Sequence, residues 1–399
     1  MNNKFIGGIL LIIGTSIGGG MLALPIATAQ LGFINAIIAL ILCWAVMTAS
    51  ALLILEVNLW HSINSNLISM AKTTLGLFGQ IIAWISYLLL LYALLAAYVA
   101  GGGDFLQNFL IGFHINLANT PSAFLFTGLL SIIVYKGIHS VDYVNRGLMF
   151  SKITAYILLV LCIFPFVSIN SLLTSAELHY FPAIISSITV VITSFGFAII
   201  VPSLRSYFEN DEKNLRKAIL IGSLIPLVCY MLWELVIMGV IPAQGDLSLM
   251  AMTHSSHSTS DLLNSLNHLL HKPIINFLAK AFTAICLATS FLGVSLSLFD
   301  FLSDGLNIKK TSLNKVMLYV ITFLPPLIIA NHFPNVFIQA LSYAGVLCVI
   351  LLILLPVMMA WSGRYIKKCA TGYQVRGGKY LLISLLSIAI MLIIVSLIY

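Results

Sequence analysis

A glycine-rich stretch inside the first apolar segment holds the residues best suited to chemistry. It reads GTSIGGGMLALP over residues 14–25, with four glycines, a Thr–Ser pair and a proline. Glycine has no Cβ and tolerates unwound backbone, so helical hydrogen bonds are left open at such a point. A half-helix that begins near Gly18 presents amide N–H groups and a positive dipole end, which suit a carboxylate. Carbonyl oxygens left unpaired in the preceding half suit an ammonium group.

A second interruption lies in the sixth apolar segment, shortly before Pro202. Its residues are Thr193, Ser194, Phe195, Gly196 and Phe197. Together the two breaks offer groups for both charges of an α-amino acid without using a charged side chain. Close packing is the simpler explanation of each break, because membrane helices are rich in Gly and Pro. Two breaks at corresponding places favour a transporter site near the bilayer midplane.

The composition predicts an all-α polytopic membrane protein. Of 399 residues, 60% are hydrophobic and 8% charged, whereas a soluble domain has about 25% charged residues. A membrane crossing takes about 20 apolar residues, and by this measure the sequence predicts eleven transmembrane helices. They run over 5–31, 34–60, 76–108, 121–138, 148–168, 182–206, 215–240, 274–302, 314–331, 334–361 and 380–398.

The distribution of Lys and Arg predicts the orientation, since these residues concentrate in cytoplasmic loops. With the N-terminus inside, all 19 Lys and Arg residues except Lys272 and Lys280 lie at or near the cytoplasmic face of the inner membrane. The C-terminal Tyr399 is then outside. The net charge of +7 follows from this topology, so no nucleic-acid partner is needed to explain it.

Three loops are longer than the others: 61–75 on the cytoplasmic side, and 169–181 and 241–273 on the outer side. Residues 61–75 are predicted to include a short surface helix on the cytoplasmic side. Residues 241–273 contain STSDLLNSLNHLL, an amphipathic helix with a Ser260 cap that is expected to lie over the outer entrance. Its apolar face consists of Leu262, Leu263, Leu266, Leu269 and Leu270. His254, His257, His268 and His271 also lie in this loop, and solvated histidines are preferred to a metal site because no carboxylate or cysteine cluster joins them.

Several segments together resemble a known family. They are GTSIGGGMLALP, SALLILEV, LLYALLAAYVAGGGDFL, VNRGLMFSK, TSFGF, VPS and ATSFLGVSLSLFDFL. From residue 5 to about 398 the sequence is similar to the bacterial aromatic amino acid permeases, of the amino acid/polyamine/organocation superfamily. The resemblance implies a LeuT-type 5+5 inverted repeat with helices 1 and 6 broken and alternating access. The halves would be 1–170 and 182–362, with an additional helix at 379–399.

The resemblance also implies a substrate site for tryptophan, tyrosine or phenylalanine. Backbone of Ser16, Ile17, Gly18, Gly19 and Gly20 would take the carboxylate. Carbonyls of Thr15, Ser16, Thr193 and Ser194, beside Gly196, would take the amine. Phe195 and Phe197 would flank the substrate side chain, with Tyr92 or Tyr98 closing the pocket and Phe291 as a weaker candidate. The alternative for each aromatic is packing, since the chain has 23 Phe and 15 Tyr.

Ionisable residues inside membrane helices are costly and therefore suggest function. The position of Lys152 resembles that of a lysine that replaces sodium in some proton-coupled members of the superfamily. It would then reach the first break and the eighth-span hydroxyls of Thr289 and Ser290. Snorkelling of Lys152 to the interface is the alternative. By the same resemblance, Glu56 would be a structural support that accepts amide bonds from the sixth helix, and an interfacial place is its alternative.

The sequence thus predicts a secondary active transporter that imports aromatic L-amino acids with a proton across the lipid bilayer. Sodium coupling between the first and eighth spans, with Lys152 structural, is the main alternative. A channel would need rings of like groups, and a membrane-embedded enzyme would need clustered His, Asp, Cys or metal ligands. Neither pattern occurs in the sequence, so no enzyme activity, metal or cofactor is expected.

Overall fold

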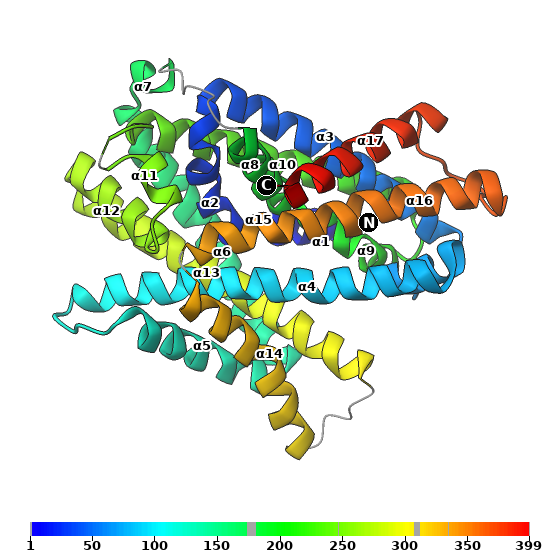
Figure 1. Cartoon of the computed structure of the whole chain (residues 1–399), viewed down its shortest axis with the longest axis horizontal. Helices are drawn as coiled ribbons and strands as arrows, with labels where there is room; N and C mark the ends of the chain where they lie inside the picture. The colour runs from blue at the N-terminus through cyan, green and yellow to red at the C-terminus, as the bar shows by residue number, and fades with distance from the viewer. Residues whose placement is uncertain (1, 174–180, 246, 307–311, 334, 399) are drawn as a thin grey trace.

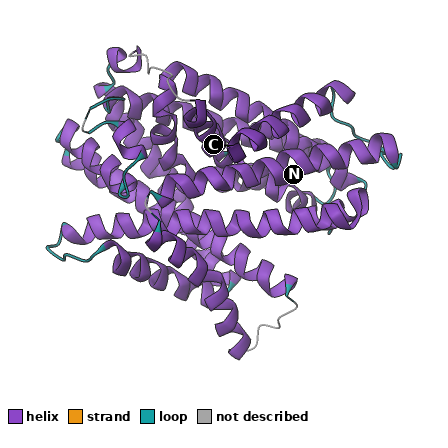
Figure 2. Cartoon of the chain, in the orientation of Figure 1, coloured by secondary structure: helices purple, strands orange, loops and turns teal. Residues whose placement is uncertain are grey.

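A computed structural model of the chain describes residues 2–173, 181–245, 247–306, 312–333 and 335–398. Lys309, Lys310 and Tyr399, which the charge argument includes, lie outside the described residues. Figure 2 shows that the described elements are helices joined by loops. The α-helices are α1 (Asn2–Ser16), α2 (Gly19–Thr28), α3 (Gly32–Leu59), α4 (Leu67–Ile111), α5 (Asn119–Tyr135), α6 (Ile138–Ile163), α7 (Ile169–Leu173), α8 (Phe181–Ser194), α9 (Val201–Tyr207), α10 (Glu212–Val240), α11 (Leu249–Thr253), α12 (Ser258–Leu270), α13 (Pro273–Gly305), α14 (Ser312–His332), α15 (Val336–Cys348), α16 (Leu355–Trp361) and α17 (Gly378–Ile398).

Short helical turns of other kinds join several of these helices. Three are 3₁₀ turns, at Ala29–Leu31, Phe164–Phe166 and Gly196–Ile200. Two are π-helical, at Val349–Leu354 and Ser362–Ile366, so that α15, α16 and the turns around them form one continuous apolar helix over 336–366.

Most predicted spans coincide with long helices. In the described part of the chain, nine helices are long and apolar enough to cross a membrane. The first predicted span differs, because it is divided into α1 and α2, and a 3₁₀ turn joins α2 to α3 at Gly32, where the backbone leaves the helical conformation (φ +71°). Eleven separate crossings stay a prediction, since Lys4–Ser16 and Asn119–Tyr135 are shorter apolar helices.

The predicted surface helix in 61–75 exists as the first part of α4. It begins at Leu67 after an Asn66 capping box, in which the Asn66 side chain and Ser69 exchange hydrogen bonds. At Gly76 the backbone has φ +80°, a conformation that L side chains rarely adopt, and the helix changes direction there. A single sharp bend therefore separates the short helix from the predicted third span.

The broken helices lie in the interior of the bundle. Every residue of α2 is buried, and α2 packs against α8, while α1 packs against α10. Figure 1 shows α4 beside α15 in the middle of the molecule, with α5 and α14 together along one side. α13 packs against both α4 and α6. These long helices surround the two interrupted ones and hold them in place.

Candidate binding site at two helix breaks

The first break lies where the glycines predict it. α1 ends at Ser16 and α2 begins at Gly19, with Gly18 in an extended conformation between them (φ −157°, ψ −152°). The Gly19 N–H donates to the Ser290 Oγ of α13 at 2.8 Å. A Cβ atom placed on Gly18 would lie 2.3 Å from that same Oγ, so a larger residue here would force the Ser290 side chain to move.

The second break also lies at its predicted position. α8 ends at Ser194, Phe195 leaves the helical conformation, and a 3₁₀ turn leads into α9, which has Pro202 in its first turn. Phe195 and Phe197 are both fully buried. A Cβ on Gly20 would lie 3.2 Å from Ser194 Oγ, so the two breaks are in direct contact.

Tyr230 of α10 joins the two breaks. Its buried hydroxyl lies 2.6 Å from the Ser16 carbonyl oxygen and 2.8 Å from the Ser194 carbonyl oxygen. Its ring packs edge-on against Phe195 with centroids 5.1 Å apart. These two carbonyls are among those predicted to take the amine. Sequence reasoning missed Tyr230, because no local motif distinguishes it from the other tyrosines.

The side chains of the remaining hydroxyl residues have mixed surroundings. Ser16 Oγ is buried and has no hydrogen-bond partner among the described residues. Thr15 Oγ1 donates to the Leu11 carbonyl of its own helix, at 2.8 Å. Thr193 Oγ1 donates to the carbonyl of Leu341 in α15, at 2.9 Å. Of these three hydroxyls, only that of Ser16 has no hydrogen-bond partner among the described residues, and it belongs to the residue whose carbonyl accepts from Tyr230.

Lys152 of α6 reaches the first break. Its Nζ donates to the Ile17 carbonyl oxygen at 2.6 Å and lies 3.4 Å from Thr289 Oγ1, and the residue is 1% exposed. Snorkelling is therefore wrong, since the ammonium group points into the bundle. Thr289 contacts this lysine, which binds the Ile17 carbonyl before the break, and Ser290 accepts from the Gly19 N–H after it. Consecutive residues of α13 thus interact with the two sides of the first break.

Two aromatic residues predicted for the pocket lie elsewhere. The Tyr92 hydroxyl donates to the Ile321 carbonyl of α14 at 2.8 Å, away from both breaks, so its proposed closing role is wrong. Phe291 packs against Phe126 and Phe323 at centroid distances of 5.5 and 5.8 Å. The cause is helical geometry, because adjacent residues point about 100° apart around a helix. Ser290 faces the break, and Phe291 consequently faces α5 and α14.

Tyr98 is the aromatic residue of the third span that does reach the site. A Cβ on Gly19 would lie 2.6 Å from the Tyr98 ring, and the Tyr98 hydroxyl interacts with the Ser290 side chain. Tyr98 thus covers the beginning of α2 from the side of α4.

Glu56 does not brace the sixth helix, contrary to the prediction. Its buried carboxylate forms a two-point ion pair with Arg364, at 2.7 and 2.5 Å, and accepts from the Val375 N–H at 2.8 Å. The physical reason is charge, because a buried carboxylate is best satisfied by a bidentate guanidinium. The sixth span is instead tied to α3 by Arg205, whose guanidinium donates to the carbonyls of Asn58 and His61.

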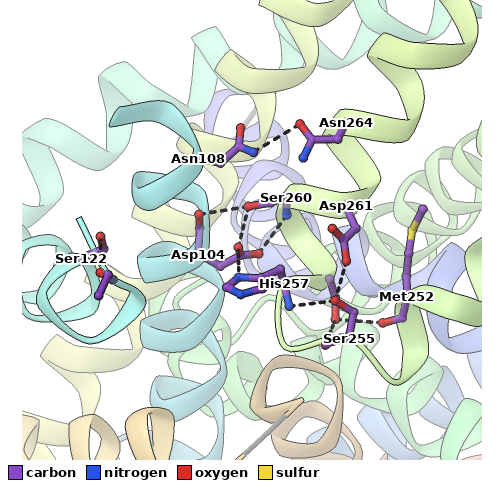
Figure 3. A network of polar contacts seen from close by, with 11 residues as sticks. Asp104, Asn108, Ser122, Met252, Ser255, His257, Ser260, Asp261 and Asn264 are labelled. Carbon is purple, nitrogen blue, oxygen red and sulfur yellow. Dashed lines mark hydrogen bonds and ion pairs between the residues drawn. The ribbon is translucent and has the colours of Figure 1, made fainter. Parts of the chain in front are cut away.

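The amphipathic helix α12 lies at one end of the bundle in Figure 1, and Figure 3 shows the polar contacts that join it to α4. α12 begins at Ser258, so the predicted Ser260 cap is wrong: Ser260 lies inside the helix and binds Asp104 of α4 through its N–H (2.9 Å) and its Oγ (2.5 Å). His257 Nδ1 is 3.0 Å from the same carboxylate. Leu269 is 40% exposed, while the other four leucines of the predicted face are buried.

The contact between His257 and Asp104 makes the docking of α12 depend on pH. The hydrogen bond to Asp104 raises the pKa of His257, which burial partly opposes. Because the pKa of His257 is raised on folding, the His257–Asp104 ion pair stabilises the docked helix fully below the pKa of an unfolded histidine, about 6.5. That stabilisation is lost as the pH rises through the pKa of His257 in the folded protein. We expect the hydrogen-exchange protection of residues 258–270, corrected for the intrinsic pH dependence of amide exchange, to be lower at pH 8 than at pH 5.5. In His257→Gln the difference should disappear, whereas the exposed control His254→Gln should keep it; an unchanged difference in His257→Gln would contradict the assignment.

These observations define a class of protein before any comparison. Two interrupted helices meet inside an apolar helical bundle, with a carbonyl of each break on one hydroxyl and a buried lysine at the first break, an arrangement typical of a polytopic membrane transport protein. The chain belongs to the tryptophan/tyrosine permease family, which matches residues 1–396. It is a permease and not an enzyme, and the resemblance seen in the sequence is confirmed.

Curated relatives match the chain along nearly its full length. The tyrosine-specific transport system 2 of Haemophilus influenzae is 33% identical, over 99% of this chain and 96% of its own. The tryptophan-specific transport protein of the same organism is 32% identical, over 95% and 92%. The glutamine transporter 2 of Aliivibrio fischeri is also 32% identical, over 90% and 89%. Aromatic amino acids thus predominate in these names, but one names glutamine.

Proposed function

We propose that this permease imports aromatic L-amino acids with a proton by alternating access, and that its site lies between the two helix breaks. The observation that carries the proposal is the Tyr230 hydroxyl bridging the Ser16 and Ser194 carbonyls. It shows backbone acceptors of both breaks turned toward one point in the interior. An α-ammonium group has the donors to take the place of this hydroxyl.

The other parts of an aromatic amino acid have matching groups nearby. We assign the carboxylate to the backbone of 16–20, where the dipole of α2 is positive and Gly18 allows close approach. The buried Ser16 hydroxyl, which has no partner among the described residues, is available to the same group. Phe195, Phe197 and Tyr98 supply ring contacts, worth about 0.5–1.5 kcal/mol each beyond burial.

Lys152 is our first choice for the coupling proton. Its ammonium group occupies a buried position between the Ile17 carbonyl and Thr289, where sodium would sit in the alternative mechanism. Loss of the proton removes the charge that binds the first break to α6 and α13. Protonation and release would therefore favour different arrangements of α1 and α2, as alternating access requires.

Glu234 of α10 is a second place for the proton. Its fully buried carboxyl is 3.0 Å from Thr28 Oγ1, and its other oxygen has no partner among the described residues. Thr28 has a single hydroxyl hydrogen, and Leu24 O accepts it at 2.8 Å. If Thr28 donates to Leu24 O, a protonated Glu234 would donate to Thr28 Oγ1, and we infer from this that Glu234 is a second candidate for carrying the proton near the end of α2.

The chain is oriented, in this proposal, with the N-terminus in the cytoplasm and the C-terminus outside the inner membrane. The halves 1–170 and 182–362 are the two inverted repeats, since each contains one broken helix. The helix over 379–399 is the addition to them.

A competition panel tests the substrate. Uptake of labelled tryptophan into proteoliposomes is measured against an excess of each natural amino acid. We expect tryptophan, tyrosine and phenylalanine to compete and leucine and glutamine not to. Competition by glutamine equal to that by tryptophan would reject the aromatic assignment and favour the substrate named for the Aliivibrio fischeri relative.

Replacing Tyr230 by phenylalanine separates its hydroxyl from its packing. In Tyr230→Phe the carbonyls of Ser16 and Ser194 lose their donor, at a cost of about 1–3 kcal/mol for a buried unsatisfied group. A bound ammonium group restores the lost bonds, so we expect a lower unfolding midpoint for the free variant and a larger upward shift on adding tryptophan. Tyr92→Phe, whose hydroxyl binds α14, is the control. An identical ligand-induced shift in both variants would show that the substrate does not replace the hydroxyl.

A further inference from the structure

A basic groove opens at the end of the bundle where α10 begins. It has a volume of about 510 Å³ and lies between α3, α10 and the segment before α17. Its basic side chains are Lys213, Arg216, Lys217 and Arg376, and Leu52 and Leu220 form apolar walls. This groove shares no residue with the helix breaks.

The positive charge of the groove is only partly neutralised. Arg216 pairs with Glu212 at 3.4 Å, and its guanidinium lies over the Tyr373 ring, 4.4 Å from the centroid. Lys213, Lys217 and Arg376 are exposed and have no ion-pair partner among the described residues. Three cations therefore line the groove without an ion pair among the described residues, with the Asp211 carboxylate near Lys213 and Lys217.

The buried ion pair of Glu56 gives the groove a fixed wall. Glu56 accepts from the Val375 N–H, and the Arg364 guanidinium lies 3.3 Å from the Val375 carbonyl. Both side chains of this pair are nearly inaccessible, at 0% and 4% exposure. The backbone next to Arg376 is thus held against α3 before any ligand arrives, which lowers the entropic cost of binding.

The apolar walls show what kind of ligand fits. Leu220 lies eight residues after the start of α10 at Glu212, which is about 12 Å along the helix. The groove is therefore basic at the end of the bundle and apolar toward its middle. A ligand that matches both parts has an anionic head and a hydrocarbon chain.

We propose that this groove binds an anionic phospholipid, with its phosphate at Lys213, Lys217 and Arg376 and an acyl chain along Leu52 and Leu220. The Lys and Arg distribution predicts that this end is cytoplasmic, and basic pockets between membrane helices on that side bind anionic headgroups. Free inorganic phosphate also carries negative charge, but it has no hydrocarbon chain to contact the apolar walls.

The test uses the purified full chain in neutral detergent and needs no transport. The unfolding midpoint is measured against increasing phosphatidylglycerol, phosphatidylcholine or inorganic phosphate. We compare Lys213→Gln/Lys217→Gln/Arg376→Gln with a control of equal charge change outside the groove, Lys72→Gln/Lys136→Gln/Lys315→Gln.

Phosphatidylglycerol should raise the midpoint of the unmodified protein and the control alike. For the groove variant, half of the effect should need at least about tenfold more lipid, which corresponds to about 1.4 kcal/mol. Phosphatidylcholine and inorganic phosphate should have little effect. Equal lipid responses of the two variants, or equal stabilisation by inorganic phosphate and phosphatidylglycerol, would overturn the proposal.

Discussion

Gly18→Val should abolish uptake while leaving membrane insertion normal. The new Cβ would lie 2.3 Å from Ser290 Oγ, which must move and release the Gly19 N–H. It would also occupy the space in which the substrate carboxylate meets the backbone. Losing two hydrogen bonds to a charged group costs about 3 kcal/mol, so we expect a reduction in uptake of at least about a hundredfold.

Two further variants separate crowding from general damage. A Cβ on Gly128 of α5 meets nothing within 4 Å, so Gly128→Val should transport normally. In Gly18→Ala/Ser290→Ala the clashing oxygen is absent, and we expect more uptake than in Gly18→Ala alone. Normal uptake by Gly18→Val would exclude the first break as the substrate site.

Lys152→Met should uncouple transport from the pH gradient. Methionine keeps the apolar length of the side chain but removes the ammonium group that binds Ile17 O and Thr289. We expect gradient-driven uptake to fall by at least about tenfold, a free-energy change of about 1.4 kcal/mol. Exchange of labelled for unlabelled substrate across the membrane needs no net proton movement and should persist.

The same assay distinguishes the alternatives for the coupling ion. If uptake requires sodium and survives Lys152→Met, the proton proposal is wrong and the site beside Thr289 binds sodium. If Glu234→Gln loses gradient-driven uptake while Lys152→Met keeps it, the proton belongs to Glu234. Lys280→Met is the matched control, since Lys280 lies on the same helix as Thr289 but has no place in the proposed site.

Local sequence predicts the features that depend on local physics. Apolar runs predict the long helices, and the glycines predict the break between Ser16 and Gly19, because both follow from the chemistry of neighbouring residues. The contact of Lys152 with the first break was expected from a family resemblance. No local pattern in the sequence between Ile17 and Lys152 predicts that contact.

The features that sequence reasoning missed are pairings between distant elements. Glu56 and Arg364 are 308 residues apart, and Asp104 and Ser260 are 156 apart. Which helices pack together decides such pairs, and each residue alone fits several partners. Tyr230 was missed for this reason, since its importance comes from the two breaks that meet at its hydroxyl.

The Tyr230 hydroxyl has one hydrogen to donate, yet it lies within hydrogen-bond distance of two carbonyl oxygens, those of Ser16 and Ser194. At any instant only one of these carbonyl oxygens accepts that hydrogen, and the other carbonyl oxygen has no donor from Tyr230. An arriving ammonium group brings three hydrogens and can satisfy both at once. Because the Tyr230 hydroxyl has too few hydrogens for its two acceptors, the substrate-free protein would favour binding of a cationic ligand at this point.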